Sequence, residues 1–305
     1  MSMSGKALYT DWPIEFGRAA QVKAAAVGVL FVATFWRLLD FIPPKLGSIT
    51  YRWVHESDWS HGPIIPLFSV YLVYLHWDRI RQMPIRHTWV GAVIMVVAIL
   101  MFHAENWGFI PFSYAADFSM MLCLLGVIIF LCGLPVMRYA WLPWLYLFFA
   151  IPIPRRYYFM MTDPLQRLAA RVTVGFLGLF PNLDIERVGT IIHPTYNGQA
   201  LLPLSVTDAC SGMRSTMVLC ALGTAVAFMV WRPWWHRAIL LAACVPIATF
   251  CNVIRVTVTC CLHVFVDPKY ATGTYHMVLG LVIILLAVLM YLGLGWVLNN
   301  LFVED

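Results

Sequence analysis

The sequence contains few charged residues. Asp, Glu, Lys and Arg make up 11% of its 305 residues, whereas about 25% is usual in a soluble domain. Hydrophobic residues make up 61%. The shortage of charge excludes an ordinary soluble fold, and the abundance of apolar side chains excludes a disordered chain. The composition therefore indicates a polytopic membrane protein.

Motifs for common metals, cofactors and nucleic acids are also missing. The eight cysteines form no C-x-x-C pair and no Cys/His spacing typical of a metal site. The sequence has no G-x-S-x-G, H-E-x-x-H, P-loop or G-x-G-x-x-G motif. Its net charge of +5 comes from short basic groups between apolar runs, not from one basic stripe. We therefore predict no metal, no cofactor and no nucleic-acid partner.

The apolar runs predict about eight membrane-spanning helices, since one span needs about 20 mostly apolar residues. These runs lie at residues 24–42, 62–77, 88–103, 116–132, 139–153, 210–231, 238–262 and 276–298. The predicted fold class is all-α, a polytopic transmembrane helical bundle that forms a single domain over residues 1–305.

The basic residues in the short loops predict the orientation, because such residues favour the cytoplasmic side. On one side lie nine of them, Lys6, Arg18, Lys23, Arg79, Arg81, Arg86, Arg138, Arg232 and Arg237. The short loops on the other side hold only Lys45, Arg52 and Lys269. We therefore expect both termini, including the N-terminal segment 1–23, to be cytoplasmic.

Residues 154–209 do not fit a simple series of spans. Within them, residues 164–180 are mostly apolar and carry Arg167 and Arg171 four residues apart, a pattern typical of an amphipathic helix on the outer interface. A ninth span is the alternative. Residues 184–208 contain turn residues and alternating apolar positions, which predict a short hairpin before the next helix.

Four ionisable side chains lie within or at the mouth of the last three predicted helices: Cys210, Arg214, Arg255 and His276. Such residues are costly in a membrane and are therefore candidates for function. With eight spans, all four reach the same outer face. Each also has an ordinary interpretation: a packed cysteine, an arginine that extends to the interface or ties down a turn, and a solvated histidine.

These residue types suit a thiol nucleophile. A helix start and a nearby cation favour the reactive thiolate, and Cys210 has both because Arg214 follows one turn later. His276 could accept the thiol proton and pass it to a leaving amine. Arg255 could stabilise an oxyanion, since a guanidinium keeps its charge in a partly dry site.

Other polar residues rank lower. His61 begins the second predicted helix on the same outer face, so it either lines the site or simply belongs to the helix start. We predict that the remaining candidates lie in loops or at interfaces: His55, Glu105, Asp117, His193 and His263.

Several motifs resemble the exosortase and archaeosortase family of integral-membrane cysteine transpeptidases, over about residues 55–298. They are S-H-G-P-I-I-P-L at 60–67, F-F-A-I-P-I-P at 148–154, P-L-Q-R-L-A-A-R at 164–171, A-C-S-G-M-R-S at 209–215, N-V-I-R-V at 252–256, and His276 with Gly280. Each motif is weak alone, but the last three occur in order at the outer ends of successive predicted helices. The histidine resembles the bacterial exosortase branch.

This resemblance implies that Cys210 is the nucleophile and that Arg255 and His276 complete the catalytic set. Four further residues are expected to support the site or bind substrate: Arg214, Ser211, Asn252 and His61. The implied partners are the lipid bilayer and exported proteins with a C-terminal sorting signal, made of a PEP-CTERM-like motif, a hydrophobic helix and a basic cluster. The implied location is the inner membrane, with the active site on the periplasmic face and a thioester resolved by an unknown acceptor amine or by water.

Two points keep alternatives open. The segment H-P-T-Y-N-G-Q-A at 193–200 stands where the family pattern suggests a tighter glycine turn, which points to a variant substrate motif. A membrane scaffold or transporter, with Arg255 and His276 along a polar path, is the alternative function.

Overall fold

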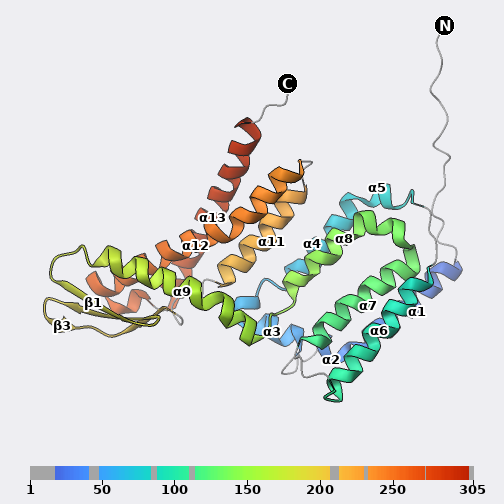
Figure 1. The fold of residues 1–305 in the computed structure, drawn as a ribbon, viewed down its shortest axis with the longest axis horizontal. Coiled ribbons are helices and arrows are strands. Elements are labelled where there is room, and N and C mark those ends of the chain that lie inside the picture. Colours follow the sequence, from blue (N-terminus) through green and yellow to red (C-terminus); the bar gives the residue numbers. More distant parts are fainter. Residues whose placement is uncertain are drawn as a thin grey trace, which may run out of the picture. The chain divides into compact units, whose positions relative to one another are not determined.

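The structure is a computed structural model that describes residues 18–40, 48–83, 88–109, 114–206, 213–229, 233–271 and 273–301. Contacts within the chain divide it into two compact units, Met1–Pro152 and Ile153–Asp305, and we describe each by itself. The colours of Figure 1 follow the sequence through both. The described residues are mostly helical, at 79%, as predicted. The single domain, with its family-like core at 55–298, stays a prediction.

The first unit contains helices only, among its described residues. They are α1 (Arg18–Thr34), α2 (Trp36–Leu39), α3 (Ile49–His55), η1 (Ser57–Trp59), α4 (Ile64–Leu75), α5 (Trp77–Ile80), α6 (Trp89–Asn106), α7 (Ala115–Cys132), η2 (Leu134–Val136), α8 (Met137–Tyr146) and η3 (Leu147–Ala150).

Helices α6 and α7 pack together through two glycines. A Cβ atom on Gly91 would lie 2.6 Å from the carbonyl oxygen of Gly126, and closer still to the backbone nitrogen of Phe130. A Cβ on Gly126 would lie 2.9 Å from the carbonyl oxygen of Gly91. Small residues let membrane helices approach this closely, so the backbones themselves form the contact.

The second unit combines helices with one small sheet. Its elements are α9 (Arg155–Leu177), β1 (Leu183–Val188), β2 (Ile191–Tyr196), β3 (Gln199–Ala200), β4 (Leu204–Ser205), α11 (Met213–Met229), α12 (Trp234–Phe265), η4 (Pro268–Ala271) and α13 (Gly273–Leu301).

Helix α12 belongs to two apolar clusters. The first joins it to α9 and the sheet, through Ala169, Ala170, Leu177, Leu183, Ile192, Leu204, Val206, Val256, Cys260 and Val264. The second joins it to α11 and α13, through Leu219, Ala227, Leu240, Cys244, Ile247, Ala248, Cys251, Ile283, Ala287, Tyr291 and Leu298. At 32 residues, α12 is about 48 Å long, which exceeds the roughly 30 Å hydrocarbon core of a bilayer.

The predicted hairpin is present and is larger than expected. Strand β2 pairs antiparallel with β1, and it also pairs with both β3 and β4. Asn197 and Gly198 both have positive φ values, 51° and 78°, which suit a two-residue hairpin turn. Residues 193–200 thus fold into β2 and β3 around this turn, and their departure from the family pattern stays a prediction.

The count of spans is established only in part. Among the described residues, α6, α7, α12 and α13 are long and apolar enough to cross a membrane, and a fifth span results if 134–150 and Arg155–Leu177 count as one broken span. The apolar helices 21–34 and 214–229 are shorter. Eight spans, and the ninth-span alternative, remain predictions.

The predicted interfacial helix begins earlier than expected. Helix α9 begins at Arg155, not at residue 164, and ends at Leu177. Pro164 lies inside the helix, on its exposed side, so the proline does not mark a helix start. Helix α9 packs on α12, where the hydroxyl oxygens of Thr173 and Thr257 lie 2.9 Å apart. Its place at the interface stays a prediction.

Candidate active site

Arg255 lies on α12, and its guanidinium packs against Gly280 of α13. A Cβ atom on Gly280 would lie 3.3 Å from Nη2 and 3.5 Å from Cζ of Arg255. Arg255 is half-buried and Gly280 is buried. Because glycine has no side chain, the arginine head group can rest directly on the α13 backbone.

This contact brings Arg255 to the part of α13 that carries His276. His276 precedes Gly280 by four residues in the same helix, and residues four apart share a helix face. The side chain of His276 lies outside the described part of the structure. The backbone nevertheless places the two motif residues of α13 one turn apart, on the face that Arg255 contacts.

Asn252 precedes Arg255 by three residues on α12 and is buried, with 4% of its surface exposed. Its Oδ1 atom has no hydrogen-bond partner within the described residues. Arg214 lies in the first described turn of α11 and is half-buried. The predicted nucleophile Cys210 and its neighbour Ser211 lie outside the described residues, which resume at Met213.

The strand that precedes Cys210 is described as far as Val206. Strand β4 pairs with β2, and the Val206 amide donates to the carbonyl oxygen of Thr190 at 3.0 Å. Val206 is fully buried in the cluster that contains Val256 and Cys260 of α12. The chain therefore reaches α12 four residues before Cys210.

His263 is buried near the end of α12, with 5% of its surface exposed. Its Nε2 atom lies 2.8 Å from the carbonyl oxygen of Leu202. His263 is therefore not a loop residue, and its place at the membrane interface stays a prediction. It is helical because α12 extends to Phe265, beyond the predicted end at residue 262.

The loop before α13 is held by Asp267. Its carboxylate accepts a hydrogen bond from the Lys269 amide at 2.9 Å, and the Lys269 ammonium lies 3.4 Å away. These interactions lower the pKa of the exposed Asp267 carboxyl, and the hydrogen bond from the Lys269 amide has the largest effect.

His61 lies in the first unit, between η1 and α4. It is buried, with 9% of its surface exposed, and its ring centroid lies 5.9 Å from that of Trp59. Since the two units are described separately, its predicted role in lining the site stays a prediction.

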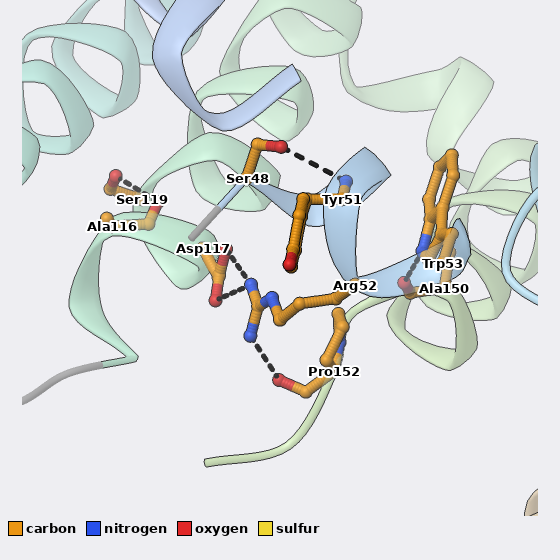
Figure 2. Close-up of polar contacts among 9 residues, drawn as sticks. All are labelled: Ser48, Tyr51, Arg52, Trp53, Ala116, Asp117, Ser119, Ala150 and Pro152. Atoms are coloured by element: carbon orange, nitrogen blue, oxygen red, sulfur yellow. Dashed lines mark hydrogen bonds and ion pairs between the residues drawn. The ribbon is translucent and has the colours of Figure 1, made fainter. Parts of the chain in front are cut away.

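The first unit contains a buried ion pair that the sequence did not predict. Nη2 of Arg52 on α3 donates to both carboxylate oxygens of Asp117 on α7, at 3.0 and 3.2 Å. Nη1 of Arg52 also donates to the carbonyl oxygen of Pro152 at 3.4 Å, as Figure 2 shows. Asp117 is therefore a buried, paired residue of α7 and not a loop residue, and its place at the membrane interface stays a prediction. The available signal was an acidic residue inside an apolar run.

A second contact in Figure 2 holds α3 to the same stretch of chain. The indole Nε1 of Trp53 donates to the carbonyl oxygen of Ala150 at 2.7 Å. The Ser48 hydroxyl accepts from the Tyr51 amide at 3.1 Å and caps α3. Arg52 and Trp53 thus hold Pro152 and Ala150 of the F-F-A-I-P-I-P motif within the first unit.

The described part of the chain contains no cluster of metal-binding side chains. Within those residues, no group of three or more His, Cys, Asp or Glu side chains could hold a metal ion.

Several apolar helices of spanning length define a multi-pass membrane protein. The chain matches the family described as Transmembrane exosortase (Exosortase_EpsH) over residues 53–293. It belongs to this family, which confirms the resemblance found in its motifs. No curated protein and no solved structure matches it. Members of the family are generally membrane cysteine peptidases or transpeptidases that act on exported proteins with C-terminal sorting signals.

Proposed function

We propose that this protein is a membrane cysteine transpeptidase that removes the C-terminal sorting signal of exported proteins through a thioester on Cys210. The observation that carries the proposal is the contact between the Arg255 guanidinium and Gly280, one helical turn from His276. This contact links Arg255 on α12 to the part of α13 that carries His276, the second of the three proposed catalytic residues.

The contacts of the segment before Cys210 support the third position. At Leu202 the chain meets α12 beside His263. Val206 shares a buried cluster with Val256 and Cys260 of α12. The described part of this segment therefore packs on the helix that carries Arg255, and Cys210 follows Val206 by four residues in the sequence.

The proposed reaction uses three groups. His276 accepts the Cys210 thiol proton, and the thiolate attacks the carbonyl carbon of the scissile peptide bond. Arg255 stabilises the resulting oxyanion. The carbon–nitrogen bond breaks, the leaving amine takes the proton from His276, and a thioester remains on Cys210. An acceptor amine or water then attacks the thioester carbonyl, gives its proton to His276 and releases the thiolate.

Four residues are proposed to support this site: Arg214, Ser211, Asn252 and His61. Of these, Asn252 has the most specific support. It lies one turn from Arg255, and its buried Oδ1 can accept a hydrogen bond. A buried acceptor without a donor is costly, so a donor from the substrate main chain would stabilise it.

The proposed setting is the inner membrane, with both termini cytoplasmic and the site on the periplasmic face. The substrate's hydrophobic helix would lie in the bilayer, and its scissile bond at the outer surface. The excess length of α12 over the hydrocarbon core allows the residues near its end to lie outside that core.

Replacement of the nucleophile tests the proposal. Cys210→Ala should express and insert normally, while uncleaved precursor of a co-expressed substrate accumulates. Cys261→Ala, at a half-buried cysteine of α12, is the matched control and should process normally. Normal processing by Cys210→Ala would contradict the proposal and favour the scaffold or transporter alternative. Mass spectrometry of the released product then separates transpeptidation from hydrolysis.

A further inference from the structure

The strand that leads to Cys210 is fastened to α12 by a side-chain hydrogen bond. The carbonyl oxygen of Leu202 lies 2.8 Å from Nε2 of His263, although the two residues are 61 positions apart. A carbonyl oxygen can only accept, so Nε2 carries the proton and donates it. Both the donor ring and the strand are thus fixed in orientation.

The second nitrogen of the same ring makes no such bond. Nδ1 of His263 is buried and has no hydrogen-bond partner among the described residues. With the proton on Nε2, this nitrogen carries a lone pair. Among the described residues, the bond to Leu202 is therefore the hydrogen bond that the His263 ring makes.

Within the sheet, β4 and Val206 are held by backbone hydrogen bonds to β2 and Thr190, but the other contact of this segment with α12 is apolar. Val206 is held in the cluster with Val256 and Cys260, and apolar contacts have little directional preference. A hydrogen bond depends steeply on distance and angle. The His263 bond therefore sets the position of the strand along α12 more strictly than the apolar contacts do.

The same helix carries the proposed oxyanion residue. Arg255 and His263 are eight residues apart on α12, which corresponds to about 12 Å along a continuous helix. A strand fixed to His263 is thereby fixed relative to Arg255. Since a displacement of about 1 Å at a reacting group can cost about 100-fold in rate, this register matters for catalysis.

We propose that His263 is a positioning residue, whose Nε2–H bond to the Leu202 carbonyl sets the position, relative to Arg255, of the described segment that precedes Cys210 in the sequence. This inference rests on the proposed function, because it concerns the placement of the proposed nucleophile. His263 does not touch the reacting atoms and has no proton-transfer role.

Two variants of the full-length protein separate the hydrogen bond from the ring itself. In His263→Gln, the amide nitrogen occupies nearly the place of Nε2 and can still donate to Leu202. In His263→Asn, the shorter amide reaches only the place of Nδ1. We expect His263→Asn to lower kcat for substrate cleavage about tenfold or more, with KM within about twofold, and His263→Gln to rescue most of the rate.

A second readout needs no substrate. The rate at which iodoacetamide alkylates Cys210 is followed by mass spectrometry of the Cys210 peptide, with the seven other cysteines as internal controls. We expect an altered rate at Cys210 in His263→Asn, a rate near that of the wild type in His263→Gln, and unchanged rates elsewhere. If the Asn variant does not purify as a monodisperse protein, His263→Leu replaces it as the variant without a donor.

The outcomes separate the two proposals. Equal behaviour of the Gln and Asn variants in both readouts, whether normal or impaired, would overturn the positioning role. If Cys210→Ala processes substrate normally, the proposed function fails, and the alkylation rates alone still decide whether His263 places the Cys210 strand.

Discussion

Two arginines, one in each unit, have different surroundings. Arg52 belongs to the first unit, its side chain is 19% exposed, and it forms a bidentate pair with the buried carboxylate of Asp117. Arg255 belongs to the second unit, and its guanidinium rests on Gly280. The first is paired with a countercharge, and the guanidinium of the second lies against the backbone of α13.

This difference assigns different tasks to the same side chain. A buried ion pair holds helix α3 against α7 and the chain near Pro152, so its loss should affect folding. The Arg255 guanidinium rests on Gly280, and in the proposed reaction it stabilises an oxyanion. The following predictions test this contrast.

The largest effect is expected at Arg255. Arg255→Ala should reduce cleavage of the sorting signal about 10²–10³-fold, as the loss of an oxyanion donor does in other enzymes, with little change in thermal stability. Arg52→Ala, measured per folded molecule, should stay within a few-fold of the wild type. Similar losses of cleavage in both variants would remove the contrast. The measurement is the cleavage rate of a purified precursor in detergent or vesicles.

The next effect concerns stability. Asp117→Ala leaves the Arg52 guanidinium without its carboxylate and should destabilise the protein by about 3 kcal/mol, measured by thermal or denaturant unfolding in detergent. Arg52→Met with Asp117→Leu removes both charges and should recover most of the loss. An unchanged melting temperature for Asp117→Ala would show that the pair is not structural.

A third test compares two glycines of the first unit. Gly91→Ala places a methyl group against the backbone of α7 and should cost about 2 kcal/mol, because neither helix can yield without a shift. Gly28→Ala on α1 is the control, since a Cβ there meets nothing within 4 Å. Equal stability of the two variants would contradict the close approach of α6 and α7.

The smallest effect is expected at Gly280. A Cβ there would lie 3.3 Å from Nη2 of Arg255, so Gly280→Ala should move the guanidinium by a few tenths of an ångström. We expect cleavage to fall about tenfold, with stability nearly unchanged. Gly293→Ala on the same helix has open space around the added methyl group and should cleave normally. Full activity of Gly280→Ala would mean that this contact does not position Arg255.

The sequence predicted the class of protein and much of the local structure. Apolar runs marked the long helices α6, α7, α12 and α13, because membrane spans have a strong compositional signal. Turn residues marked the hairpin that contains β1 and β2. The motifs around Arg255 and Gly280 predicted which helices carry the site, and the contact between these two residues agrees with that prediction.

The remaining features depend on partners that are distant in the sequence. Asp117 is buried because Arg52, 65 residues earlier, pairs with it. His263 can be buried because the Leu202 carbonyl accepts a hydrogen bond from its Nε2 atom. No local pattern contains such pairings. The start of α9 was misplaced for another reason: Pro164 is typical of a first helical turn, but here it lies inside the helix.

The most direct test of the central claim is mass spectrometry of Cys210 during turnover. Purified wild-type protein mixed with precursor and stopped rapidly in acid should yield a Cys210 peptide that carries the truncated substrate as a thioester. The adduct should disappear with hydroxylamine, be absent in Cys210→Ala and accumulate when acceptor amines are withheld. Cleavage of the precursor at a normal rate by Cys210→Ala, with no adduct on the wild-type cysteine, would contradict the account.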